Sequence, residues 1–395
     1  MKFIDVVSTT QQAVAELLGA DYMEKTGDFA QLDSYKLTDV GKAVSDVEGG
    51  IDKFVKAVLV QRGRLYIESR AYTSELSNIY VDSFDWGGYV ERVFFKPQDL
   101  IKDEMYALVD GASYDDHVFY EPNVVSKVFE EAKTIMCPIS ITEDAVKMSF
   151  TSWDEMNRFM SGIEQNVRNT IDIGLDAYAH MLVACGIAVS DKAIKTSVHL
   201  LTEAIARGIV ESGTTAAEAM ESEAFITFAM RRMAEVEAQM HRYTSAYNNH
   251  TLGVQAKDVN KILLNDFVQA SKFLVKANTY NKDEIGIGNY DTVSAWQSVV
   301  NITGQDTADY FAFENNSKIK IKGDATNKLG CGTSDITIGN VIGIAYDRMA
   351  MGICPFKQKV TSSYTAIADF WNQYYHTLVN YILDTNYPIV AFIVD

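Results

Sequence analysis

The chain has 395 residues, of which 47% are hydrophobic and 22% charged, with 24 Gly and only 5 Pro. This composition is that of a globular protein and excludes a disordered or collagen-like chain. A single compact core stops growing at about 250–300 residues, so we expect two lobes with extensions. The formal net charge is -18, which argues against a specific nucleic-acid-binding groove, because such grooves neutralise phosphates with cations.

The N-terminus and the apolar segments bear on where the protein is made. Lys2 and Asp5 are charged, so the apolar run of a secretory signal is lacking. No stretch approaches the roughly 18 uncharged apolar residues that a membrane span requires. We therefore expect a protein that is made in the cytoplasm and has no membrane partner.

Residues 1 to about 80 mix short apolar groups with acidic residues and turn formers, for example at Gly27 and Gly49. They show no sustained apolar period, which a helix or strand that buries one face requires. We predict that this segment is an arm and not a domain.

Two segments that follow, 89–95 and 118–129, are rich in β-branched and aromatic residues, as strands are. Between them lies an acidic, turn-prone stretch at 110–116. We predict a long two-stranded excursion over 84–140. Because two strands cannot bury a face by themselves, this hairpin needs a surface on another molecule, which indicates oligomerisation.

The clearest helix is predicted to begin after Ser152, which forms a capping box with Glu155. Apolar residues then recur every three or four positions; they are Trp153, Met156, Met160, Ile163, Val167, Ile171, Leu175, Tyr178 and Leu182. Gly186 is the predicted C-terminal stop. A helix of this length spans about 45 Å, which is long enough to brace two lobes.

A second helical region is predicted from Thr215, which forms a capping box with Glu218, to about His241. It is followed by a strand, a helix and two further strands at 261–266, 267–277, 296–302 and 318–321. This order is α+β, without the regular alternation of a doubly wound sheet.

The C-terminal residues 338–395 contain three predicted strands. The first, at 338–346, ends in a run from Asp347-Arg348-Met349 to Ile353, and a loop follows. The second is a long aromatic strand at 370–383, and the third runs over 388–394 after a turn. Since the third has no apolar and polar alternation, both of its faces should be covered.

No residue pattern typical of catalysis, cofactor binding or metal binding is present. The six histidines lack the spacings of metal sites, and His180 is the most tempting of them. The glycine pairs around Ile287 and Cys331 each match half of a dinucleotide-binding fingerprint. Neither is followed by the third glycine and a helix, so both predict turns. The four cysteines form no C-x-x-C pair and are expected to be buried small hydrophobes; they are Cys137, Cys185, Cys331 and Cys354.

The order of these elements resembles the Hong Kong 97 type fold of tailed-phage major capsid proteins, in particular those of short-tailed phages (podoviruses). The likeness covers nearly the whole chain. Its most specific local feature is the strand that runs into Asp347, Arg348 and Met349, and the rest is the order and spacing of elements.

The resemblance implies an α+β fold with five segments. They are an N-terminal arm and the start of the peripheral domain (1–83), the E-loop hairpin (84–140), the spine helix and peripheral domain (141–189), the axial domain (190–344) and the return strands of the peripheral domain (345–395). In this scheme Asp347, Arg348 and Met349 mark the peripheral domain. Contacts between subunits are expected along the E-loop, at Tyr89, Val93, Phe95, Tyr106, Asp110, Tyr114, Val118 and Tyr120.

The resemblance also implies function. Copies would assemble as pentamers and hexamers into an icosahedral virion shell around double-stranded phage DNA, which is held without specific binding. Nothing marks a long scaffolding segment or a cleavage site, so we expect a separate scaffolding protein and a portal as partners during assembly in the host cytoplasm. No cofactor is expected.

Two other functions remain open on sequence grounds. An encapsulin-like nanocompartment shell shares the fold but encloses an enzyme in place of a genome. An enzyme or ligand-binding protein of unrecognised α+β fold would have its site near His180 or the Gly330 loop. Fold alone does not decide among these functions.

Overall fold

The structure is a computed structural model of the chain. It describes residues 14, 18, 39–40, 42–44, 76–81, 90–95, 98, 100, 104–106, 108–114, 117–129, 132–142, 153–248, 253–278, 290–297, 313–323, 325–327, 329–365, 367 and 370–395. The chain divides into two compact units, as its length predicted. The first comprises Met1–Ser77, Lys133–Asp176 and Pro355–Val379; the second comprises Asn78–Ala132, Ala177–Cys354 and Asn380–Asp395.

The predicted arm is described only at scattered positions. Of these, Val14, Val40 and Val44 are helical and buried, so parts of this segment form helix, where the sequence showed no sustained period. The predicted cap residue Ser152 lies outside the described residues.

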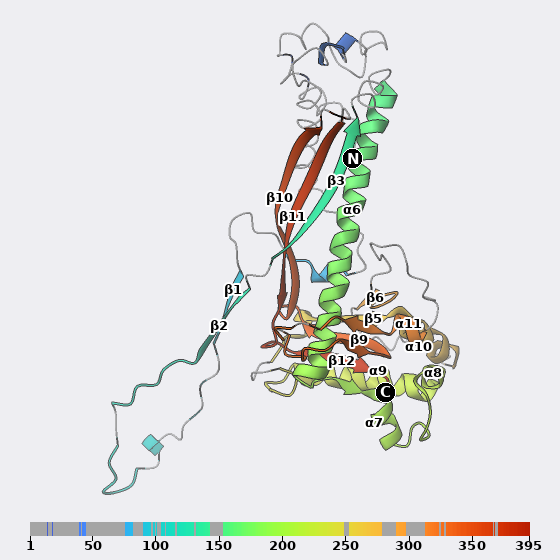
Figure 1. Ribbon diagram of the computed structural model, residues 1–395. Helices are drawn as coiled ribbons and strands as arrows, with labels where there is room; N and C mark the ends of the chain where they lie inside the picture. The colour runs from blue at the N-terminus through green and yellow to red at the C-terminus, as the bar shows by residue number, and fades with distance from the viewer. Residues whose placement is uncertain are drawn as a thin grey trace. The chain divides into compact units, whose positions relative to one another are not determined.

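The first unit contains a three-stranded sheet in the order β10-β11-β3 and the N-terminal part of helix α6 (Figure 1). Its strands are β3 (Ala132–Thr142), β10 (Met351–Thr365) and β11 (Phe370–Leu383). The bounds of β11 are those predicted. The predicted loop after Ile353 is wrong, because β10 continues to Thr365 and pairs through its backbone with β11.

Helix α6 (Trp153–Ala188) has 36 residues, which corresponds to about 54 Å. Its start agrees with the prediction, but the predicted stop at Gly186 is wrong. The helix continues to Ala188 and ends through a π-helical turn, Val189–Ala193. A Cβ at Gly186 would clash with Sδ of Met351 and lie 3.6 Å from the Ile344 side chain, so this glycine permits close packing and does not end the helix.

Helix α6 also bears on the expectation that no segment approaches membrane-spanning character. That expectation is wrong for Gln165–Ala193, which is long and apolar enough to cross a membrane by length and composition alone. However, 61% of its most apolar window is buried inside the structure. The same test is passed by buried core helices, so this is weak evidence for a span.

The second unit is built on a five-stranded mixed sheet in the order β4-β12-β9-β5-β6. Its strands are β4 (Val198–His199), β5 (Val259–Leu264), β6 (Asp291–Val293), β9 (Val341–Asp347) and β12 (Ile389–Ile393). The neighbours β12 and β9 pair antiparallel, as do β5 and β9. Every residue of β9 and β12 is buried, which confirms that the last strand is covered on both faces.

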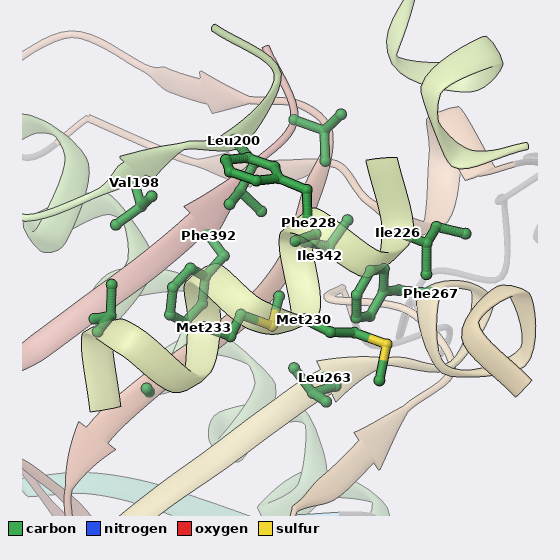
Figure 2. Packing of buried hydrophobic residues seen from close by; sticks show 14 of the residues in the cluster. Val198, Leu200, Ile226, Phe228, Met230, Met233, Leu263, Phe267, Ile342 and Phe392 are labelled. Atoms are coloured by element: carbon green, nitrogen blue, oxygen red, sulfur yellow. The ribbon is translucent and has the colours of Figure 1, made fainter. Parts of the chain in front are cut away.

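Four helices of the second unit are α7 (Leu200–Ala206), α8 (Ala216–Met220), α9 (Glu223–Met240) and α10 (Asn265–Asn278). Figure 2 shows Phe228 and Met233 of α9 among buried side chains that include Phe392 of β12 and Leu263 of β5. A cluster of this size anchors the unit, because each fully buried large apolar side chain contributes about 1.5–3 kcal/mol.

Several predicted elements of this unit differ in detail. The capping box of Thr215 and Glu218 is confirmed, but it begins the short helix α8, and α9 starts separately at Glu223. The predicted strand over 338–346 is two strands, β8 (Ile336–Ile338) and β9, separated at Asn340, whose φ is 57°. A left-handed residue interrupts strand geometry.

The remaining predicted strands gave mixed outcomes. The one at 318–321 corresponds to β7 (Ile319–Ile321), which pairs with β8. At 296–302, residues 296–297 form a bend, and the rest lie outside the described residues. Trp296 is nevertheless part of the core, since it is 1% exposed and its indole Nε1 donates to the Val341 carbonyl.

Candidate functional site

The predicted hairpin begins as a short antiparallel ribbon of β1 (Val90–Phe95) and β2 (Val124–Phe129). Its register pairs Val90 with Phe129 at one end and Phe95 with Val124 at the other. Strand β2 therefore starts later than predicted. Residues 118–123 are described without strand pairing, so the regular part of the hairpin is six residues long on each side.

The ribbon has two different faces, because residues directly opposite in an antiparallel pair point to the same side. One face carries Lys127 and Phe129, which are half-buried and buried respectively. The other face carries only exposed residues; they are Glu91, Val93, Phe95, Val124, Ser126 and Val128. We call this second set the outer face. Four of its side chains are apolar, so the ribbon is covered by its own chain on one side only.

Beyond the ribbon, the described residues between β1 and β2 expose further large apolar side chains. Tyr106, in a short 3-10 helix (Glu104–Tyr106), is 84% exposed, and Phe119 is 83% exposed. The others in this stretch are Leu100, Met105, Leu108, Val109, Tyr114, Val118 and Tyr120. Exposed apolar groups gathered on one segment mark an interaction site more often than scattered ones do.

Part of the predicted turn-prone stretch at 110–116 forms a turn, and residues 115 and 116 lie outside the described residues. Asp110 and Gly111 lie in the turn, and Gly111 has a φ of 80°, which a residue without Cβ adopts readily. The amide of Ala112 donates to the Val109 carbonyl, and the Val109 amide donates to the Tyr114 hydroxyl at 2.8 Å. This part of the loop therefore has a defined local conformation.

The predicted contact residues are thus exposed on the hairpin wherever they are described. Val93 and Phe95 lie on the outer face, and Tyr106, Asp110, Tyr114, Val118 and Tyr120 lie beyond it. Tyr89 lies outside the described residues. The prediction missed several exposed apolar residues of the same segment, such as Leu100 and Phe119, although their position between the two strands was a sufficient signal.

The Asp347-Arg348-Met349 feature forms a turn at the end of β9. The Asp347 carboxylate accepts a hydrogen bond from the Met349 amide at 2.8 Å. The backbone carbonyl of Asp347 accepts one from the Ala350 amide at 2.7 Å. Burial raises the pKa of Asp347, while the hydrogen bond from the Met349 amide lowers it. The Met349 carbonyl accepts a hydrogen bond from Arg92 in β1, so this turn contacts the base of the hairpin.

One constellation outside the hairpin resembles catalytic machinery. His199 Nε2 lies 3.2 Å from Ser197 Oγ, and His199 Nδ1 lies 2.5 Å from Asp395 Oδ1. However, Ser197 Oγ donates to Asp191 at 2.9 Å, so its proton faces a carboxylate and not the imidazole base that a nucleophilic serine needs. The Asp395 carbonyl also accepts from the amide and hydroxyl of Thr202. These contacts hold the chain after β12 against β4 and α7.

The other candidates for chemistry are structural. His180 is buried in α6, and Gly330 and Gly332 have positive φ values, as the predicted turn requires. The four cysteines, all of which the structure describes, form no disulfide; Cys137 and Cys354 are buried as expected, whereas Cys185 and Cys331 are half-buried. Burial raises the pKa of the Cys185 thiol to about 11, so it is protonated and unreactive at neutral pH. Among the described residues, no group of His, Cys, Asp and Glu could hold a metal ion.

Comparison with known proteins decides the family. The family model described as Phi29-like phage major capsid protein matches residues 12–393. The chain belongs to this family. It is therefore a phage major capsid protein and part of the virion, which confirms the resemblance seen in the order of its elements.

Solved structures confirm the fold of this capsid protein. A chain in the capsid structure of Staphylococcus phage Andhra is similar over 82% of this chain and 84% of that one, with 10% identity and a TM-score of 0.51. A chain in the structure of the head fiber and inner core protein gp22 of native bacteriophage P68 is similar over 82% and 85%, with 10% identity and a TM-score of 0.52. No curated protein matches the sequence. The α+β, Hong Kong 97 type fold is thus shared with tailed-phage particles.

Proposed function

We propose that copies of this capsid protein associate as pentamers and hexamers, and that the hairpin carries the main contact between neighbouring copies. The observation that supports this is the outer face of the ribbon, where Val93, Phe95, Val124 and Val128 are all exposed. A protein that self-assembles supplies its own partner for such a face, so the occupant is a second copy of this chain. The residues predicted on the sequence, from Tyr89 to Tyr120, are its contact residues.

The chemistry of the segment fits a repeated interface. The apolar side chains of the hairpin lie along one narrow segment and not on a broad surface, so each contact is modest in strength. Contacts of modest strength allow misplaced subunits to leave during assembly. Many copies bound to several neighbours at once then hold the closed shell through multivalency. The chain is acidic, with a net charge of -18, so the wall of the shell would repel DNA. The closed shell would therefore enclose the DNA without binding it specifically.

We also propose the segment boundaries and assembly partners that the resemblance implies. The segment boundaries at 83, 140, 189 and 344 define arm, E-loop, spine helix, axial domain and return strands. Assembly takes place in the host cytoplasm with a separate scaffolding protein and a portal, without a membrane, a cofactor or a catalytic role. The nanocompartment and enzyme alternatives are not favoured, since the family match is to phage major capsid proteins.

The first experiment tests assembly itself. The full chain is expressed with and without its neighbouring genes and examined by sedimentation and electron microscopy. Closed particles, or rings of five and six copies, are expected. A persistent monomer or dimer under all assembly conditions would contradict the proposal.

The second experiment tests the hairpin. In one variant residues 107–116 are deleted, and in the other they are replaced by a glycine and serine linker of equal length. Both variants lack Leu108, Val109 and Tyr114, and the linker variant keeps the loop length. Both variants should give a folded subunit with an unchanged unfolding temperature that fails to form shells. Normal shells from the linker variant would show that this segment is not the contact.

A further inference from the structure

The base of the hairpin carries two cations directly opposite each other. In the register of the ribbon, Arg92 of β1 pairs with Lys127 of β2. Such side chains lie on the same face at about 5 Å between Cβ atoms, and like charges in this position destabilise a strand pair. The ribbon therefore needs anions or carbonyl oxygens from elsewhere in the chain to be stable in this register.

Those groups come from two turns of the second unit. Lys127 Nζ lies 3.6 Å from the Asp384 carboxylate and donates to the Leu383 carbonyl at 3.3 Å. The Arg92 guanidinium donates to the Met349 carbonyl. Asp384 follows β11, and Met349 lies between β9 and β10. Both cations are thus bound where long strands of the sheets turn.

Aromatic rings complete the surroundings of the two cations. The Arg92 guanidinium carbon lies 5.9 Å from the ring centroids of Phe129 and Tyr387, and Lys127 Nζ lies 5.2 Å from the Phe129 ring. Cations at this distance from an aromatic face are attracted to it. The Asn380 amide also donates to the Phe129 carbonyl at 3.2 Å, which ties the end of β2 to β11.

The Asp384 carboxylate is buried, so it depends on the neighbouring cations for its stability. The Asp384 side chain is 2% exposed, and its carboxylate also accepts from the Asn386 amide at 3.2 Å, so its own turn holds it in place. Burial lowers the pKa of Arg92, whereas Asp384, Tyr387 and Asp347 raise it. A buried carboxylate that loses its cation is left uncompensated, which is strongly unfavourable.

We propose that Arg92, Lys127 and Asp384 form a clamp that fixes the direction in which the hairpin leaves its unit, and thereby the angle between neighbouring subunits in the shell. Hydrogen bonds and ion pairs are directional, so three side chains held this way define an orientation better than the exposed apolar residues of the outer face do. This inference rests on the proposed role of the hairpin in assembly.

The test uses the full chain with both cations neutralised, Arg92→Gln together with Lys127→Gln. The matched control is Lys320→Gln with Lys322→Gln, which removes the same charge from two exposed lysines at β7. The double clamp variant should fold, as judged by circular dichroism. Its amides at 90–95 and 124–129 should exchange hydrogen about tenfold faster than in the wild type, because their local opening becomes easier.

The particles report on the angle. Under conditions in which the wild type forms shells of one diameter, the clamp variant should give shells of several diameters or open sheets in electron micrographs, while the control variant should match the wild type. The conservative pair Arg92→Lys with Lys127→Arg should restore the single diameter. Normal shells together with wild-type hydrogen exchange in the clamp variant would overturn the inference.

The outcomes separate this inference from the proposed function. If the wild type forms no shells at all, the proposed function fails, but hydrogen exchange of the subunit still tests the clamp. If the double variant does not fold, Lys127→Gln alone is measured in the same way, since it leaves Arg92 and its contacts in place. Unchanged exchange in that variant would count against the clamp.

Discussion

The five-stranded sheet and the hairpin ribbon are made of the same kinds of residue but have opposite surroundings. In β9 and β12 every residue is buried. In β1 and β2 one face is covered by the same chain and the outer face is exposed. Both regions have strand-forming, apolar sequences, so composition alone does not reveal which of them the subunit covers by itself.

The chain thus divides its apolar residues between folding and assembly. Helices cover both faces of the five-stranded sheet. Phe392 belongs to the cluster with α9, and Ile344 lies near Gly186 of α6. Among the described residues, nothing covers the outer face of the ribbon. The opposite face, which carries Arg92 and Lys127, is held by a few directional contacts. Changes in the sheet should therefore act on subunit stability, and changes on the outer face should act on association.

The largest effect is expected in the core of the sheet unit. Phe267 of α10 is 0% exposed and packs in the cluster of Figure 2. Phe267→Ala should lower the free energy of unfolding by about 3–5 kcal/mol, because it removes buried apolar surface and leaves a cavity. Urea unfolding of the subunit measures this. A loss below about 1 kcal/mol would show that the core is less tightly packed than its burial indicates.

The converse change is Phe95→Ser on the outer face, where the side chain is 68% exposed. It should leave the unfolding free energy within about 0.5 kcal/mol. Covering this ring in an interface contributes about 1.5–3 kcal/mol, so the threshold concentration for assembly should rise at least about tenfold. Light scattering over a concentration series measures the threshold.

Tyr243→Ser provides the control for this prediction. Tyr243 is 64% exposed but lies outside the hairpin, so it should change neither stability nor the assembly threshold. Equal effects of the two substitutions would mean that loss of any exposed aromatic residue impairs assembly, and that the outer face has no special part.

Several elements could be predicted because their signals are local. The Ser152 and Glu155 spacing predicted the start of α6, the aromatic run predicted β11, and the Thr215 and Glu218 spacing predicted the cap of α8. In each case the stabilising contacts are a few residues apart along the chain. Short-range periodicity and capping are the information that a single sequence carries most directly.

The failures concern contacts between distant residues. Gly186 looked like a helix stop, but its role depends on Met351, which packs against it in three dimensions. The part of β10 after Ile353 was predicted to be a loop, because its pairing with β11 leaves no local pattern in the sequence. The hydrogen bond from Arg92 to the Met349 carbonyl was not predicted, since the two residues are 257 positions apart and no local pattern connects them. The contacts that cover one face of the hairpin ribbon come from distant parts of the same chain, so they are visible only in the structure.

A third prediction tests the helical cover of the sheet. Gly186→Ala gains up to about 1 kcal/mol of helix propensity, but its Cβ would clash with Sδ of Met351, which is 1% exposed and has little room to move. Overpacking costs about 1–3 kcal/mol, so a net loss of about 1 kcal/mol is expected. Thermal unfolding measures this change.

The same helix provides the control for Gly186. Nothing lies within 4 Å of a Cβ added at Gly162 in α6, so Gly162→Ala should stabilise the subunit by up to about 1 kcal/mol. Stabilisation by both substitutions would mean that α6 and the sheet do not pack closely at Gly186. Neither change should affect assembly, because neither residue belongs to the outer face.

The smallest effect concerns salt and distinguishes an apolar contact from an ionic one. Copies with a net charge of -18 repel one another, and raising the salt concentration from 0.1 M to 1 M shortens the screening length from about 10 Å to about 3 Å. Wild-type assembly should therefore become modestly easier, as measured by the same light-scattering threshold. Phe95→Ser should remain deficient by the same factor at both concentrations, because screening does not replace a lost apolar contact. If high salt instead weakened wild-type assembly, the contact between copies would depend on opposite charges, and the outer face would not be its main component.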